Sequence, residues 1–207
     1  MRLPNAVHET GPWRIHAITR DFVLEDAWAL PVSGSAEDFQ VFLDQLLDSD
    51  PAQSLSLPAR TLWQIREVLG RALRLGRISV PTDRDDTAGR LPIPGTGETS
   101  LTERLPLDLR GTAADVDFGT VPFEPLYRTD VELAAEMSNR TVHGVLHLAW
   151  VDRGDGQYDG RMAVYVKPRG PLGSAYMQFI KPFRHWIVYP ALLRQIERAW
   201  AERTVST

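Results

Sequence analysis

Apolar and polar residues alternate along residues 139–151, and a second apolar run follows at 161–167. An Asp/Gly-rich turn around Gly154 separates the two runs, a pattern that predicts a β-hairpin. Residues two apart in a strand share a face, so His143 and His147 lie on a mixed face while the opposite face is uniformly apolar. We expect the apolar face to be the core face. By strand rise the two histidines stand about 13 Å apart, too far to ligate one metal ion without a third element.

The first half of the chain predicts one strand and two helices. Residues 1–12 are polar and irregular, residues 13–18 read as an extended stretch, and residues 22–32 form the first strand. Ser35 then caps a helix, and Pro58 opens a second one with an apolar stripe and arginines on its exposed face. The apolar positions of the first helix have helical spacing and are Phe39, Phe42, Leu43, Leu46 and Leu47.

A long segment, residues 76–121, is rich in proline and glycine and has little periodicity. Loops of this length are uncommon in compact domains, so we expect it to run over the surface or to act as a lid. Within it, Thr99 or Ser100 caps a short helix, with Glu103 three residues after Ser100.

The last part of the chain predicts further strands and a long helix. Residues 123–129 read as an edge strand, because Pro125 lacks the donor that an internal strand needs. Residues 131–138 have helix-forming composition, but their alternation favours a strand. The final third keeps a helical stripe that Pro182 and Pro190 must kink or divide.

Composition excludes several function classes. The chain has 207 residues, a net charge of −4 and no Lys/Arg-rich run, which argues against nucleic acid as a partner. It has no cysteine, so disulfides, thiolate catalysis and cysteine-ligated metals are excluded. No apolar run approaches the ~18 residues that span a bilayer, and no signal-like segment begins the chain. We therefore expect no membrane insertion and a cytoplasmic location.

Five segments of the chain form a pattern that extends over most of its length. They are Trp13-Arg14-Ile15-His16, residues 91–101, residues 138–148 with Trp150, residues 162–167 and Pro182-Phe183-Arg184-His185. Together they resemble a bacterial family, the domain of unknown function 2867. The resemblance covers about Gly11 to Trp200, and its histidine-bearing segment is the most distinctive part.

The resemblance and the order of elements both imply an α+β helix-grip fold, like that of birch-pollen-allergen-like (Bet v 1-like), START-like lipid-transfer and polyketide-cyclase proteins. In this fold a curved antiparallel sheet wraps a long C-terminal helix over a cavity, with two helices after the first strand. We expect one such domain at 11–203. The family's domain also occurs fused behind a nucleotide-binding reductase domain, so a separate reductase is a possible partner. This chain has no Rossmann half, which leaves hydride transfer without support, and the resemblance implies no cofactor.

Candidate site residues come from the hairpin and the final helix. His143 and His147, with His185 as a third member, could exchange protons in a cavity or could simply join elements by hydrogen bonds. A metal site formed by these three is not predicted. Arg140 could hold a ligand carboxylate or pair with Glu136. The full set of candidate ligand-binding residues is His143, His147, Tyr165, Arg184, His185, Arg140 and Tyr127.

Three functions remain open at this level. The leading one is binding of a small, largely apolar molecule between the sheet and the final helix. The second is a cofactor-free enzyme, such as a cyclase or dehydratase, that uses a histidine as acid or base. The third is a module that docks onto a separate reductase. No nucleophile elbow and no His-Glu-x-x-His motif occurs, so the sequence leaves open whether the protein is an enzyme.

Overall fold

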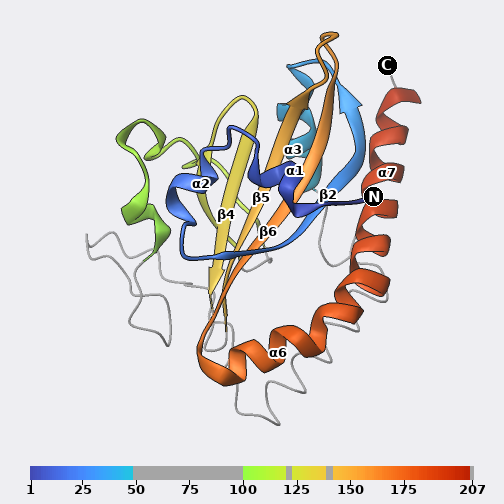
Figure 1. Ribbon diagram of the computed structural model, residues 1–207. Coiled ribbons are helices and arrows are strands. Elements are labelled where there is room, and N and C mark those ends of the chain that lie inside the picture. The colour runs from blue at the N-terminus through green and yellow to red at the C-terminus, as the bar shows by residue number, and fades with distance from the viewer. Residues whose placement is uncertain (49–99, 120–122, 139–141, 206–207) are drawn as a thin grey trace.

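The computed structural model describes residues 1–48, 100–119, 123–138 and 142–205. In these residues a six-stranded antiparallel sheet has the strand order β1-β2-β6-β5-β4-β3 (Figure 1). The fold is α+β, as predicted. The strands are β1 (Arg2–Leu3), β2 (Val23–Gly34), β3 (Glu124–Arg128), β4 (Glu132–Ser138), β5 (Val142–Asp152) and β6 (Tyr158–Pro168).

The helical elements are four short ones, the helix α3, and a long C-terminal region. The short ones are α1 (Asn5–Glu9), α2 (Ile15–Ile18), η1 (Leu101–Arg104) and η2 (Leu107–Leu109), and α3 (Asp38–Asp48) follows β2. The C-terminal part consists of α6 (Gly170–Phe183), a π-helical segment η3 (Arg184–Val188) and α7 (Tyr189–Val205).

Both faces of the sheet are buried. The apolar face of β5 packs against α3 and α7, with Leu148 and Trp150 in its core, and we call it the helix face. The mixed face is covered by the residues before β2 and by η1 and η2, and we call it the N-terminal face. The apolar face is a core face as expected, but the histidine-bearing face is a second one, because other segments close over it.

The N-terminal segment was wrongly predicted. Residues 1–12 contain β1 and α1, and residues 13–18 contain α2 instead of an extended stretch. Helices of four or five residues are too short to show apolar periodicity, and contacts with the rest of the fold must stabilise them. The Asn5 side chain of α1 donates a hydrogen bond to the Leu24 carbonyl at 2.6 Å, and Ile15 of α2 is fully buried.

Most of the other elements match their predictions. The hairpin β5–β6, strand β4, edge strand β3 and helix α3 lie where the sequence placed them. The helix expected from Pro58 lies outside the described residues. The described part of the segment 76–121 covers the sheet instead of running over the surface, because Leu101, Leu105 and Leu109 are buried on the N-terminal face. Ser100 caps η1 by accepting from the Thr102 amide.

The C-terminal helix is divided between its two prolines, as predicted. The amide of Tyr189 donates to the Arg184 carbonyl five residues earlier, which is the π-helical pattern. Pro190 has no amide hydrogen to donate to the Trp186 carbonyl four residues before it. The change from α-helical to π-helical hydrogen bonding therefore lies where the proline would interrupt a regular α-helix. Figure 1 shows α6 and α7 meeting at a bend there.

Candidate functional site

Two glutamate–histidine pairs join β4 to β5 on the N-terminal face. Glu132 and Glu136 are four residues apart on β4, and His143 and His147 are four residues apart on β5. The strands are antiparallel, so each histidine reaches the glutamate diagonally across the ladder. The Nε2 atoms of His143 and His147 lie 2.8 and 3.0 Å from carboxylate oxygens of Glu136 and Glu132.

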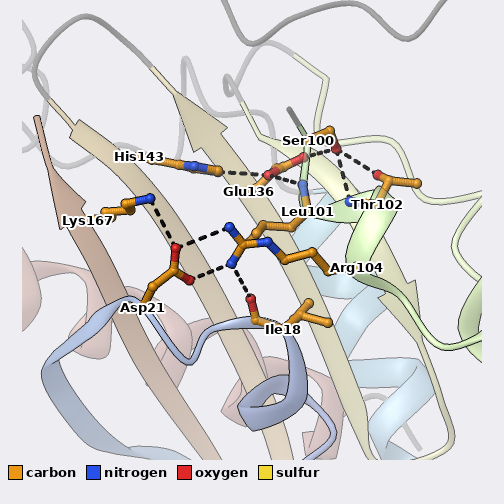
Figure 2. A network of polar contacts seen from close by, with 9 residues as sticks. All are labelled: Ile18, Asp21, Ser100, Leu101, Thr102, Arg104, Glu136, His143 and Lys167. Carbon is orange, nitrogen blue, oxygen red and sulfur yellow. Dashed lines mark hydrogen bonds and ion pairs between the residues drawn. The ribbon is translucent and has the colours of Figure 1, made fainter. Parts of the chain in front are cut away.

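Residues at the start of η1 hydrogen-bond to the glutamate of the Glu136–His143 pair (Figure 2). Its carboxylate receives hydrogen bonds from the Ser100 hydroxyl and, at 3.1 Å, from the Leu101 amide, in addition to the contact with His143. This carboxylate therefore sits at the start of η1, where backbone donors have no partner within the helix. The arrangement fastens η1 to the sheet.

The glutamate of the Glu132–His147 pair likewise accepts hydrogen bonds from neighbouring elements, here from Arg14 and Tyr127. Its carboxylate accepts from the Arg14 amide at 3.1 Å and from the Tyr127 hydroxyl at 2.7 Å. Burial disfavours ionisation of Glu132, but hydrogen bonds from His147 and Tyr127 outweigh it and lower the pKa of the carboxyl. Burial also lowers the pKa of His147, against the opposing effect of Glu132. An ionised carboxylate only accepts, so Nε2 of the neutral His147 carries its proton and Nδ1 carries a lone pair.

That Nδ1 atom belongs to a group of rings that we call the His8 cluster. The cluster consists of His8, Trp13, His16, His147 and Tyr165. His8 is its centre: its ring centroid lies 5.1 Å from that of His147, 5.8 Å from those of Tyr165 and His16, and 5.9 Å from that of Trp13. The N-terminal segment and strands β5 and β6 thus meet at one point.

Every member of the His8 cluster buries a polar atom that has no hydrogen-bond partner among the described residues. These atoms are Nδ1 and Nε2 of His8, Nε1 of Trp13, Nε2 of His16, Nδ1 of His147 and the Tyr165 hydroxyl. An unpartnered buried donor or acceptor costs about 1–3 kcal/mol. Such a concentration of them in one place is unusual for a region that serves packing alone.

Burial keeps His8 and Tyr165 of the cluster uncharged. Burial, with the nearby His147, His16 and Arg161, lowers the pKa of His8 to about 3. Burial also raises the pKa of the Tyr165 hydroxyl, with Glu9 and Glu132 adding to the effect. At neutral pH His8, His147 and Tyr165 therefore offer uncharged imidazole and phenol groups.

A second polar network lies on the helix face around the fully buried Asp26. Its carboxylate accepts from Arg184 at 2.7 Å and from Tyr189 at 3.3 Å, and lies 2.5 Å from His185 Nε2. A bulge at Glu25 places Asp26 on this face although Leu24 points to the other one. These three partners come from the C-terminal helix region, so the network holds the π-helical segment against β2. A fourth partner, Arg2 of β1, has its Nε atom 3.7 Å from the Asp26 carboxylate.

The predicted site residues do not form one site. His143, His147, Tyr165 and Tyr127 lie on the N-terminal face, whereas Arg184 and His185 lie on the helix face. Arg140 lies outside the described residues. The expected site between the sheet and the final helix is therefore not assembled from these side chains, because strand alternation directs the histidines and Tyr165 away from that helix.

Sequence reasoning missed His8, Trp13, His16, Glu132 and Asp26. The matching four-residue spacings of two glutamates and two histidines on neighbouring antiparallel strands could have indicated both pairs. Nothing in the spacing of His8 indicates that it meets His147. Among the described residues, no group of three or more His, Asp or Glu side chains is arranged to hold a metal ion.

Comparison with known proteins places the chain in a family. Residues 18–191 match the family model described as Protein of unknown function (DUF2867). The chain belongs to this family. The matched range includes both glutamate–histidine pairs and Tyr165, and it begins after His8, Trp13 and His16. Neither a search of curated proteins nor a search of solved structures found a match. No helix in the described part of the chain is both long and apolar enough to cross a membrane.

Proposed function

We propose that this DUF2867 protein binds a small molecule at the His8 cluster, between the N-terminal segment and the sheet. The observation that carries this proposal is the convergence of buried, unpartnered polar atoms on rings that touch one another. A ligand with both donor and acceptor groups would supply the missing partners. Its body would be planar or aromatic, because every side chain of the cluster carries an aromatic ring.

Two other buried polar groups of the sheet have the hydrogen-bond partners that the His8 cluster lacks. The carboxylates of Glu136 and Asp26 each have several hydrogen-bond partners from neighbouring elements. The fold thus supplies hydrogen-bond partners for carboxyl groups on both faces of the sheet, yet leaves ring nitrogens and a hydroxyl without them at the His8 cluster. Since total folding stability is commonly about 5–15 kcal/mol, several such losses favour a site that is completed by another molecule.

This proposal differs from the sequence expectation in position and polarity. The site lies on the N-terminal face instead of between sheet and final helix, and its ligand is polar as well as aromatic. The helix-grip relationship and the cytoplasmic location stay proposals. An antiparallel sheet with a long C-terminal helix packed on one face supports the former.

Native mass spectrometry of the full chain, compared with the same sample after denaturation and extraction, tests the proposal. His147→Gln should release a co-purifying molecule, whereas His143→Gln should retain it. His143 is the matched control because it lies on the same strand and face, is equally buried and pairs with a glutamate, but has Phe22 as its ring neighbour. A bare chain mass, together with a crystal structure in which only water contacts the cluster, would contradict the proposal.

The docking role beside a reductase stays a second candidate because of one surface feature. Exposed apolar side chains at Phe179, Phe183, Trp186 and Ile187 have helical spacing on α6 and η3, and Trp186 is 81% exposed. Such a stripe is typical of a contact surface. Pull-down with reductases from the same cell, using the wild type and Trp186→Ser, tests this role; equal recovery with both proteins would count against it.

A further inference from the structure

We infer that His147 is a general base that removes a proton from the carbon beside a carbonyl group of a neutral aromatic ketone bound at the His8 cluster. This inference rests on the proposed binding function and adds a reaction and a substrate class to it. It would make the protein an enzyme that needs no cofactor for this step.

The first support is the orientation of His147. Glu132 receives the Nε2 hydrogen at 3.0 Å and is itself held by the Arg14 amide and the Tyr127 hydroxyl. The ring is fully buried and its tautomer is fixed, so the lone pair is on Nδ1. Nδ1 has no hydrogen-bond partner among the described residues and belongs to the His8 cluster. A base oriented by a carboxylate on its far side is a common arrangement in acid–base catalysis.

The second support is the position of Tyr165. In the β5–β6 ladder Tyr165 is opposite Val145, and His147 is opposite Ala163, so the two side chains are diagonal neighbours on one face. Both rings contact His8. The Tyr165 hydroxyl is buried and unpartnered in the described structure, and it can donate to a ligand oxygen close to the base.

The proton and electron movements balance without another reactant. The lone pair of Nδ1 takes the proton, the electrons of the broken C–H bond form a C=C bond, and the carbonyl π electrons move to oxygen. The Tyr165 hydroxyl stabilises this enolate by donating a hydrogen bond. The carboxylate of Glu132 stabilises the imidazolium, which then returns its proton to the same carbon or to another carbon of the enolate. Glu132 is thus a positioning residue.

The substrate class follows from the polarity of the cluster. None of its unpartnered atoms belongs to a carboxylate, ammonium or guanidinium group. A charged ligand would therefore find no charged partner among these unpartnered atoms, and burying its charge would be costly. A carbonyl oxygen matches the Tyr165 donor, and an aromatic ring matches the faces of Trp13 and His8. The partial exposure of Trp13 and His16 indicates that a ligand would enter beside them.

Exchange of carbon-bound hydrogen for deuterium tests the inference. The probe is 2-tetralone, a neutral bicyclic ketone, incubated with the full chain in D2O and followed by proton NMR. Exchange at the carbon between ring and carbonyl should be at least ~10²-fold faster with the wild type than with His147→Gln. His143→Gln should exchange within about threefold of the wild type, and circular dichroism should verify that each variant is folded.

Two further variants distinguish loss of catalysis from loss of ketone binding and from a purely structural effect. Tyr165→Phe removes one oxygen and should slow exchange about tenfold or more while saturation-transfer NMR still detects bound ketone. In Glu132→Gln the exchange rate should acquire a different pH profile, which a purely structural role would not produce. Bound ketone without exchange above the buffer rate would overturn the role of His147, and failure of 2-tetralone to bind would overturn the substrate class. Neither result would affect the binding function, which the co-purifying molecule tests independently.

Discussion

His147 and Glu132 are joined diagonally across β5 and β4, with 3.0 Å between Nε2 and a carboxylate oxygen. The glutamate holds one ring nitrogen. The other has no hydrogen-bond partner in the described structure, and its ring centroid lies 5.1 Å from that of His8. One histidine thus belongs both to the framework of the sheet and to the proposed binding site. The distinction between these two roles can be tested with closely matched variants.

Two tyrosines of the N-terminal face should respond oppositely to loss of their hydroxyl groups. Tyr127 donates to Glu132 at 2.7 Å, so Tyr127→Phe should lower the free energy of unfolding by about 1.5–3 kcal/mol. Tyr165 has no such partner, so Tyr165→Phe should leave the free energy unchanged or raise it in the ligand-free protein. Urea unfolding measures both. An equal loss in the two variants would show that the Tyr165 hydroxyl is bonded in solution.

Glu132→Gln should destabilise the protein by about 3–5 kcal/mol, because the carboxylate accepts from an amide, a phenol and an imidazole while buried. Chemical unfolding of the variant provides the measurement. Glu37→Gln is the control, since Glu37 is exposed and its replacement should change the free energy by less than about 0.5 kcal/mol. A small effect of Glu132→Gln would mean that water replaces these contacts.

His8 should make stability depend on pH in mildly acidic solution. Its pKa is about 3 in the folded protein, below the value of 6.5 for an unperturbed histidine, so the unfolded chain binds the additional proton between these values. Stability is therefore highest above about pH 6.5 and falls with decreasing pH, by about 1.4 kcal/mol per pH unit for one such group. Urea unfolding between pH 5 and 6.5 avoids most carboxylate titration. His8→Gln should reduce this slope, and an unchanged slope would contradict the burial of a neutral His8.

Gly11 permits the close approach of Trp13. A Cβ atom at residue 11 would lie 2.6 Å from Trp13 Cε2 and closer still to its Nε1, so Gly11→Ala must displace the indole. We expect a loss of about 1–3 kcal/mol and a shift in tryptophan fluorescence. Gly144→Ala is the comparison, because its added Cβ would meet Met137 Cγ at an ordinary 3.4 Å. Equal losses in both variants would contradict a special role for Gly11.

Asp26→Asn should weaken the attachment of the C-terminal helix. The change leaves the buried Arg184 without its carboxylate partner, for which we expect a loss of about 3–5 kcal/mol in thermal or urea unfolding. Asp21→Asn removes a more exposed carboxylate that pairs with Arg104 and Lys167, and it should cost about 1 kcal/mol or less. Similar losses in the two variants would argue that burial of Asp26 adds little.

The sequence predicted the elements whose signal is local. The alternation in β4 and β5 and the stripe of α3 each repeat over several residues, so propensity and period agree. The bulge at Glu25 breaks such a rule: it separates Leu24 from Asp26 across the sheet, although counting by two puts them on one face. The short α1 and α2 have no period to detect.

The candidate site was predictable only in part for the same reason. His147 and Tyr165 belong to strands, and their shared face follows from the pairing of β5 with β6. His8 reaches them through a segment that precedes all the long strands, and its position depends on how β1 and α1 attach to β2. Contacts of this kind arise from tertiary packing and leave no spacing in the sequence.

Glu132 and Glu136 also disfavour a one-residue shift in the pairing of β4 with β5 during folding. A slip of one residue would turn Glu132 and Glu136 toward Leu148 and Trp150, where two carboxylates would be buried in an apolar core. A slip of two residues keeps the correct face: in one direction it places each glutamate directly opposite its own histidine, and in the other it places Glu136 opposite His147. Strands misaligned by one residue are therefore less stable than the native pairing, so the same glutamates that hold the two histidines also fix which face of β4 turns toward the helices.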